Sequence, residues 1–207
     1  MKTIVVHHNF ENHNKEANSS FNKETKFPQI YTLPDTAINR NGRPFFVPDF
    51  ASRCLVELHL VFRICRLGKN ISQRFAHRYY DAITIGASFT ASNIFNELTN
   101  SKSPWDLSKG FDGSTSIGNF LLLNDIIGGL DECQYSLGYN DVTIQEGHYK
   151  DMKMKIDEII SYVSNYYTLR QGDLIFTGCP CIPTEIEVNS KISGKINETP
   201  CLAFNIK

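Results

Sequence analysis

The sequence predicts an α+β fold in which short strands outnumber helices. Most apolar residues occur in short runs or in alternation, and Pro, Gly and Asn turn signals bound these runs. The clearest helical spacing of apolar residues lies at 155–166, and the chain has no internal repeats. At 207 residues the chain fits a single domain, 1–207, with an N-terminal strand, helix and loop in 1–40 and a core in 41–207.

The N-terminal region carries the first candidate catalytic pair. A strand is expected at 3–8, two helical turns at 9–17 and a polar loop at 18–28. Asn9 suits the N-cap of the helical turns. His13 and Glu16 are three residues apart, which makes them neighbours on one helical face. A carboxylate beside an imidazole can orient it as a general base, and an ordinary surface pair is the alternative.

A long apolar run at 53–66 is expected to be the central strand. Successive side chains of a strand point to opposite faces, so one face is apolar throughout. That face carries Val56, Leu58, Leu60, Phe62 and Ile64. Glu57, His59 and Arg63 share the other face with Val61. Glu57 and His59 could converge on one cation or substrate, but two ligand-type residues without a third rarely make a metal site. Alternatively, they form the solvent-facing side of the strand.

The remaining elements follow from turn residues and the apolar runs between them. Further strands are expected at 29–33, 45–47, 83–90, 120–123, 132–137, 141–145, 174–177 and between 185 and 206. The strands at 132–137 and 141–145 should form a hairpin through Gly138, Tyr139 and Asn140. Helices are expected at 74–82 and 155–166, and a shaped loop at 103–113, which contains the only tryptophan.

Composition bears on the partners and the location of the protein. With 21 Lys and Arg against 22 Asp and Glu, the formal net charge is −1, so bulk charge points to neither nucleic acid nor a membrane surface. The apolar run at 4–6 is too short for a signal-peptide core, and no stretch approaches the ~18 apolar residues of a membrane span. A cytoplasmic location is therefore expected.

The six cysteines are dispersed, which predicts reduced thiols, and Cys179 with Cys181 is a weak metal signal.

Four segments stand out by their order and spacing. They are Pro34-Asp35-Thr36-Ala37, the run at 44–50, Pro104-Trp105-Asp106-Leu107-Ser108-Lys109-Gly110-Phe111-Asp112 and Gly172-Asp173-Leu174-Ile175-Phe176-Thr177-Gly178. Together they resemble the fumarylacetoacetate hydrolase family, over almost the whole chain. The resemblance implies a mixed β-roll with few short helices, in a homodimer. It also implies relatives that are C–C bond hydrolases, acylpyruvate hydrolases, oxaloacetate decarboxylases or tautomerases, usually with Mg²⁺ or Mn²⁺.

The resemblance assigns roles to individual residues. His13 and Glu16 fall where the family has the base pair of its lid helix. Lys109 falls on a lysine that assists the substrate. Substrate-binding positions of the family fall on Asp112, Thr177 and Gly178.

The metal site of the family is only partly kept. Its three carboxylates fall on Glu57, His59 and Ser88, so an imidazole and a hydroxyl stand where two further negative charges are expected. A family lysine falls on Leu33, and a glycine-rich ligand-binding loop of the family falls on 179–183, where this sequence has no glycine. Because Mg²⁺ binds mainly through carboxylates, we expect Mg²⁺ or Mn²⁺ to bind weakly or not at all. A softer ion held by Glu57 and His59 is a further alternative.

Two functions remain open, and with them whether the chain is an enzyme. In the first, the pocket binds a small organic acid or a partner but has lost the standard chemistry, as in a pseudoenzyme. In the second, the chain is an active hydrolase, decarboxylase or tautomerase of 2-oxo acids that uses His13, Glu16 and Lys109. The combined losses at His59 and Ser88 favour the first.

Overall fold

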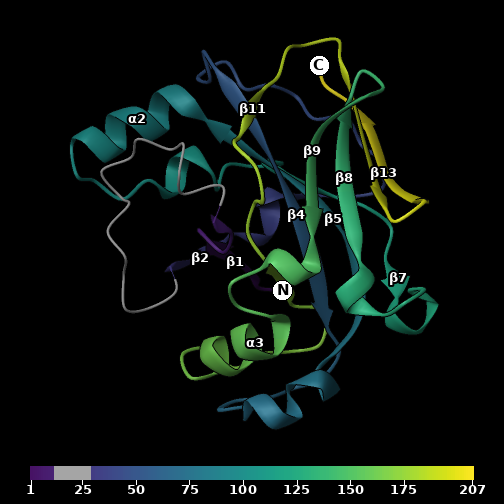
Figure 1. The fold of residues 1–207 in the computed structure, drawn as a ribbon. Coiled ribbons are helices and arrows are strands. Elements are labelled where there is room, and N and C mark those ends of the chain that lie inside the picture. Colours follow the sequence, from purple (N-terminus) through teal and green to yellow (C-terminus); the bar gives the residue numbers. More distant parts are fainter. Residues whose placement is uncertain (12–28) are drawn as a thin grey trace.

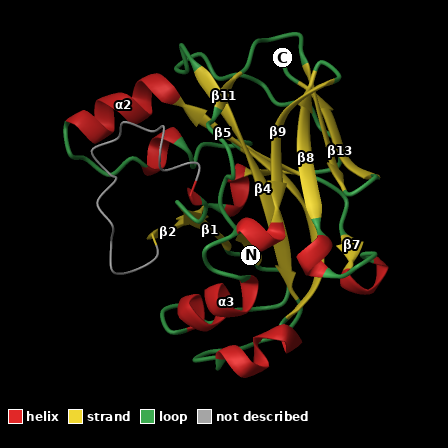
Figure 2. Ribbon diagram, viewed as in Figure 1, coloured by secondary structure: helices red, strands yellow, loops and turns green. Residues whose placement is uncertain are grey.

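The computed structural model describes residues 1–11 and 29–207, which form two β-sheets with helices at their margins (Figures 1 and 2). The described part of the large sheet consists of β1 (Thr3–His7), β2 (Gln29–Leu33), β3 (Ile38–Asn39), β4 (Cys54–Ile64), β5 (Tyr80–Ala91), β6 (Thr115–Ile117), β7 (Leu121–Leu122), β10 (Leu174–Phe176) and β11 (Thr184–Glu185). The small sheet consists of β8 (Gln134–Tyr139), β9 (Val142–His148), β12 (Lys191–Ile196) and β13 (Thr199–Asn205). The described α-helices are α2 (Ser92–Asn100) and α3 (Ile156–Ser164).

The large sheet is mixed, whereas the small sheet is antiparallel. The order of the large sheet is β2-β1-β10-β4-β5-β6-β3, with β11 added to β4 and β7 added to β5. The pairs β1–β10 and β3–β6 are parallel. The order of the small sheet is β13-β12-β8-β9. A mixed sheet accompanied by few helices confirms the predicted α+β class.

Strand β4 is the centre of the fold. It pairs with β5 along its whole length and with β10 and β11 on its other edge. Its predicted apolar face is confirmed, because Val56, Leu58 and Leu60 are fully buried in the main core. The opposite face carries Val61, which packs in a second apolar cluster. Glu57 and His59 lie on that second face and are each only 3% exposed, so the solvent-facing alternative was wrong.

Two further predictions are confirmed. Helix α3 buries the apolar side chains that repeat along it, and the Glu158 carboxylate accepts a hydrogen bond from the Lys155 amide at 2.9 Å, which caps its first turn. Strands β8 and β9 form the predicted hairpin, but Gly138 and Tyr139, which were expected in its turn, belong to β8. Its turn lies at Asn140 and Asp141, with φ of 48° and 66°, the left-handed conformation that tight hairpins favour.

Other predicted elements were wrong. The helix expected at 74–82 is a 3₁₀ turn, η2 (Gln73–Arg78), because the chain joins β4 as strand β5 from Tyr80 onward. The buried strand expected at 120–123 is the two-residue β7, whose Leu122 is exposed. The strand expected at 45–47 is reduced to one bridge between Phe45 and Ile206. Helix α2 and strand β6 were not predicted.

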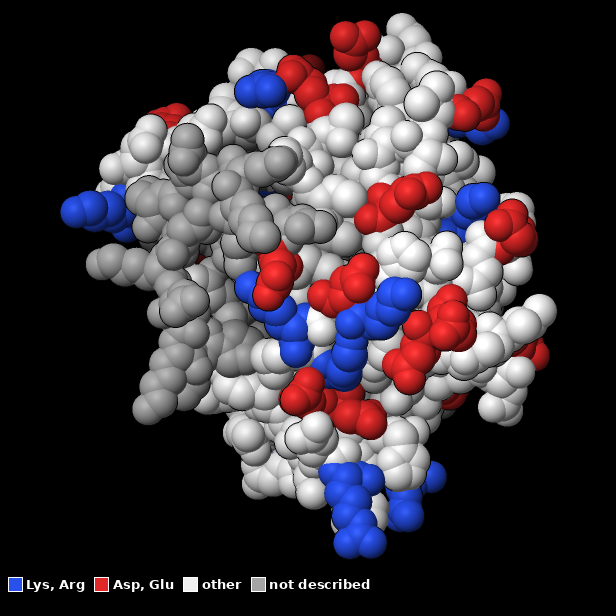
Figure 3. Space-filling view, viewed as in Figure 1, with Lys and Arg blue, Asp and Glu red and all other residues white. Residues whose placement is uncertain are grey.

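The surface offers no single-sign patch on the face drawn in Figure 3, where acidic and basic side chains are interspersed. This mixture agrees with the formal net charge of −1. In residues 1–11 and 29–207, none of the helices has both the length and the apolar character needed to cross a membrane.

We expect the protein to lose stability in alkali, because three of its thiols are buried. Burial raises the pKa of the Cys54 and Cys133 thiols to about 12 and that of Cys201 to about 11. Unfolded chains release these protons near pH ~8.5. Each thiol therefore stabilises the fold fully below that pH, and its contribution falls by about 1.4 kcal/mol per pH unit above it, up to the folded-state pKa.

We expect urea unfolding under reducing conditions to give a clearly smaller free energy of unfolding at pH 10 than at pH 8. The Cys133→Ala variant serves as the control, because it should show a shallower pH slope than the parent protein. Equal free energies of unfolding at the two pH values would contradict the prediction.

Candidate active site

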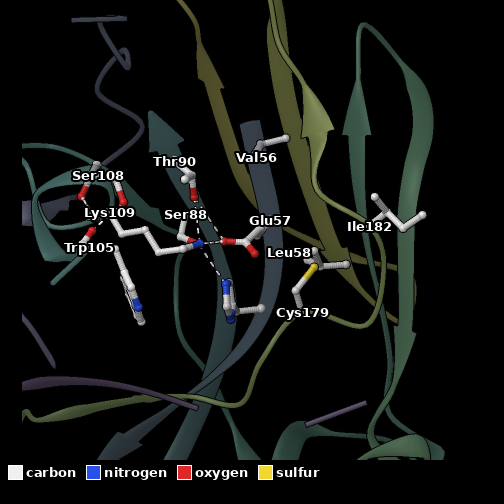
Figure 4. Close-up of polar contacts among 12 residues, drawn as sticks. Val56, Glu57, Leu58, Ser88, Thr90, Trp105, Ser108, Lys109, Cys179 and Ile182 are labelled. Carbon is white, nitrogen blue, oxygen red and sulfur yellow. Dashed lines mark hydrogen bonds and ion pairs between the residues drawn. The ribbon is translucent and has the colours of Figure 1, made fainter. Parts of the chain in front are cut away.

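The candidate site is a polar cluster on the second face of β4 and β5 (Figure 4). Glu57 pairs directly with Ser88 across the two strands, while Leu55 pairs with Thr90. Because residues two apart on a strand share a face, Glu57 and His59 stand beside Ser88 and Thr90. The His59 Nε2 atom lies 2.9 Å from the Ser88 hydroxyl oxygen. The register of one strand pair therefore builds half of the site.

Gly86 faces His59 across the strand pair and leaves room for the side chains of Phe176 and Val61. A Cβ atom at Gly86 would lie 2.5 Å from the Phe176 ring and 2.8 Å from Val61, so only glycine fits. The Phe176 ring instead packs edge-on against His59, with ring centroids 5.4 Å apart. The imidazole is thereby held between an apolar ring and the Ser88 hydroxyl.

Lys109 completes the cluster from the loop after α2. The 3₁₀ turn η3 (Asp106–Ser108) precedes it, and the Ser114 hydroxyl donates to its carbonyl oxygen at 2.7 Å. The Lys109 ammonium donates hydrogen bonds to the Glu57 carboxylate and, at 2.8 Å, to the Thr90 hydroxyl. Lys109 is 6% exposed, so this is a buried ion pair. Buried charges need such pairing, because water no longer solvates them.

An aromatic wall lies beside the charged cluster. The rings of Tyr31 and Trp105 meet edge to face with centroids 4.8 Å apart, and those of His7 and Phe95 lie about 6 Å from Trp105. Burial raises the pKa of the Tyr31 phenol well above its usual value, and nearby Glu57 acts in the same direction. Tyr31 therefore stays a neutral hydrogen-bond donor at physiological pH.

Gln145 anchors the strand that carries the site. Its side-chain oxygen accepts a hydrogen bond from the Leu58 amide at 2.7 Å, and its nitrogen donates to the Val56 carbonyl at 2.9 Å. The side-chain nitrogen of Gln145 also donates to the Thr184 hydroxyl at 3.0 Å. Leu58 lies between Glu57 and His59 in the chain, so Gln145 fixes the backbone of the site from the opposite face of the sheet.

The donor atoms present do not fit a hard divalent ion. A metal at the predicted position would meet one carboxylate from Glu57, one imidazole from His59 and one hydroxyl from Ser88. The carboxylate already binds the Lys109 ammonium, and the imidazole lies against the hydroxyl. Nowhere in the described part of the chain do three or more His, Cys, Asp or Glu side chains gather in a way that could hold a metal. Mg²⁺ and Mn²⁺ prefer several oxygen ligands, mostly carboxylates.

Comparison with known protein families decides the wider identity. Residues 2–203 match the family model described as fumarylacetoacetate (FAA) hydrolase C-terminal. The chain belongs to the fumarylacetoacetate hydrolase family. The resemblance carried by the four sequence segments is thereby confirmed.

Curated relatives and solved structures agree with this family. The mitochondrial oxaloacetate tautomerase FAHD1 of Mus musculus is 29% identical over 204 residues, which are 99% of this chain and 90% of that protein. A fumarylacetoacetate hydrolase family protein from Yersinia pestis CO92 has a TM-score of 0.87 at 25% identity, covering 100% of this chain and 92% of the other. Fumarylpyruvate hydrolase from Pseudomonas aeruginosa, solved with Mn²⁺ and pyruvate, has a TM-score of 0.89 at 23% identity and covers 100% and 89%. These similarities confirm the β-roll fold.

The structure brings together four of the residues that the family resemblance singled out. Glu57, His59, Ser88 and Lys109 form one cluster, although their roles in function stay predictions. His13 and Glu16 lie outside the described residues, as do most of the helix expected at 9–17 and the loop expected at 18–28.

The three predicted substrate-binding residues have different surroundings. The Thr177 hydroxyl donates to the Leu60 carbonyl at 2.9 Å, so it secures the end of β10. Gly178 has φ of 102°, and a Cβ atom there would lie 3.2 Å from the Val6 carbonyl oxygen, so this position requires glycine. Asp112 is exposed. Substrate binding by these residues stays a prediction.

Sequence reasoning missed Thr90, Tyr31 and Gln145 as parts of the site. Thr90 follows Ser88 by two positions on one strand, so the alternation of β5 could have identified it. Tyr31 and Gln145 come from strands whose positions relative to β4 depend on the whole fold. No local signal marks either residue.

Proposed function

We propose that this fumarylacetoacetate hydrolase family protein binds a small organic acid without the divalent-ion chemistry that the family resemblance implies. The observation that carries the proposal is the ion pair between Lys109 and Glu57, the one carboxylate at the three family metal positions. With that carboxylate bound to an ammonium, the described residues offer no set of three strong protein ligands.

The chemistry of the relatives supports an acid of the 2-oxo or 1,3-dicarbonyl type. One relative is named as an oxaloacetate tautomerase, and a structural neighbour was solved with pyruvate. Both compounds carry a carboxylate beside a keto group. In this chain the Lys109 ammonium would bind the carboxylate of the ligand, and neutral Tyr31 would donate a hydrogen bond to its keto oxygen.

A second candidate function is an active hydrolase, decarboxylase or tautomerase of such acids, with an altered ion or none. It is favoured by Lys109, which keeps its family position and is buried within the cluster. His13 and Glu16 would then act as the base pair that removes a proton from the bound acid.

Binding and turnover measurements distinguish the two candidates. In the presence of EDTA, we expect calorimetry to detect binding of pyruvate, and we expect Lys109→Met to weaken it at least ~10-fold, or about 1.4 kcal/mol. Lys102→Met, which removes an exposed lysine of the same region, should leave binding unchanged. Interconversion of the keto and enol forms of oxaloacetate should proceed at the background rate with or without Mn²⁺. Turnover above the background rate, with or without Mn²⁺, would instead establish the active enzyme.

Assembly and location complete the proposal. We propose a homodimer, by analogy with the family, and a cytoplasmic location. The name of the mouse relative places that protein in mitochondria, so fractionation of cells that produce this chain is the direct test of location.

A further inference from the structure

We infer that the Lys109 ammonium is the resident cation of this site. It balances the charge of the Glu57 carboxylate, a role that the family resemblance assigns to a divalent ion. The inference deepens the proposed function and rests on it for the nature of the ligand. It concerns the Lys109–Glu57 pair and the Thr90 hydroxyl that joins it.

The burial of both partners is the first argument. Among the ion pairs of the described residues, this is the one in which both side chains are buried, at 6% and 4% exposure. The other pairs each have at least one side chain exposed by about a third or more, as in Arg53 with Glu185. An isolated buried carboxylate is unstable without a cation, so Glu57 needs a counter-charge whether or not a ligand is present.

The placement of the ammonium is the second argument. It reaches Glu57 and Thr90 from a loop, whereas those two residues lie on the paired strands β4 and β5. An ammonium has three donors, and these contacts engage two of them. The third can bind the carboxylate of an organic acid. The cation of the site is therefore part of the chain itself, and neither folding nor ligand binding should require a metal.

Thermal unfolding of paired variants tests this inference without any ligand. Lys109→Met and Glu57→Gln each leave one buried charge uncompensated, so each should lower Tm by roughly 10 °C. The double variant removes both charges and should recover most of that loss. A matched control is the exposed pair Arg53–Glu185, where Arg53→Met, Glu185→Gln and their combination should each change Tm by less than about 2 °C.

Metal dependence is measured in the same experiment. The parent protein should have the same Tm in EDTA and in 1 mM Mn²⁺, because Lys109 already occupies the place of the cation. Two results would overturn the inference: a double variant no more stable than the single variants, or a parent protein whose Tm rises with Mn²⁺.

Pyruvate titration in EDTA separates this inference from the proposed function. If the parent protein binds pyruvate and the folded double variant binds it at least 10-fold more weakly, Lys109 is the cation of the ligand as well as of Glu57. Equal binding by both proteins would overturn that role of Lys109. If the parent protein does not bind pyruvate, the proposed ligand class fails, while the recovery of Tm in the double variant still decides the charge balance.

Discussion

Replacing His59 by Glu and Ser88 by Asp together is expected to raise the affinity of this protein for Mn²⁺ at least ~100-fold. The two substitutions place new carboxylates beside Glu57, because Ser88 faces it across the strand pair and His59 follows it on the same face. Three carboxylates supply the oxygen ligands and the negative charge that a hard divalent ion prefers.

The size of the effect follows from electrostatics. Two unit charges 4 Å apart attract by about 4 kcal/mol at an effective dielectric constant of about 20, and the substitutions add two such charges near a divalent ion. Burying the new carboxylates opposes this attraction, which is why we expect about 2.8 kcal/mol, or ~100-fold, rather than the full sum.

Calorimetric titration with Mn²⁺ measures the gain. The control makes the same two changes in residue type at exposed positions, Ser72→Asp with His77→Glu, and should leave Mn²⁺ affinity at the level of the parent protein. If the His59→Glu/Ser88→Asp variant binds Mn²⁺ no better than this control, then the identity of these two side chains does not limit metal binding. The hypothesis that the two missing carboxylates weaken metal binding at this site would then be wrong.

The sequence was sufficient to predict β4 and its two faces, because alternation is a local property of the chain. It was not sufficient to decide whether Glu57 and His59 face water. Alternation separates two faces but does not say what covers each of them. Here the second face is closed by residues distant in the chain, including Phe176 from β10 and the loop that carries Lys109.

The missed elements have weak local signals. Strand β6 contains Thr115 and Ser116, whose small polar side chains gave no apolar pattern, and it forms through pairing with β5 and β3. The segment at 74–82 shows the reverse case. Its apolar spacing suggested a helix, but pairing of β5 with β4 from Tyr80 onward overrode it.

The candidate site was predictable as a set of residues but not as a set of contacts. The family resemblance identified Lys109 and Glu57 separately. Their ion pair joins positions 52 residues apart, and only the folded chain shows that the ammonium binds the carboxylate directly. This contact changes the chemical interpretation, because it provides a counter-charge for Glu57 within the protein.

Gln145→Met is expected to lower the free energy of unfolding by about 2–3 kcal/mol, since a buried backbone donor of β4 left without a partner costs about 1–3 kcal/mol and a second hydrogen bond is lost with it. The donor is the Leu58 amide, which the Gln145 side chain binds at 2.7 Å. The second bond goes to the Val56 carbonyl at 2.9 Å, and Val56 also pairs with Thr184 of β11. Methionine has a similar length but cannot replace these two hydrogen bonds.

The need for Gln145 arises from a gap in the sheet. Strand β10 pairs with β4 as far as Val61, and Thr177 still reaches the Leu60 carbonyl, whereas β11 pairs with β4 again only at Val56. Between these points the chain at 178–183 does not pair with the edge of β4. The Gln145 side chain from β9 supplies the missing partner of the Leu58 amide, and a buried backbone group without a partner is costly.

Urea unfolding and hydrogen exchange together test this explanation. The control is Gln134→Met, an exposed glutamine on the neighbouring strand of the same hairpin, which should change the free energy of unfolding by less than about 0.5 kcal/mol. In Gln145→Met the Leu58 amide should exchange much faster, while the His59 amide, which faces Gly86 in the strand pair with β5, should keep its protection. Equal stability of the two variants would show that β4 does not depend on Gln145. If only the Leu58 amide loses protection, Gln145 holds the backbone between Glu57 and His59, and the geometry of the site depends on a side chain from the opposite face of the sheet.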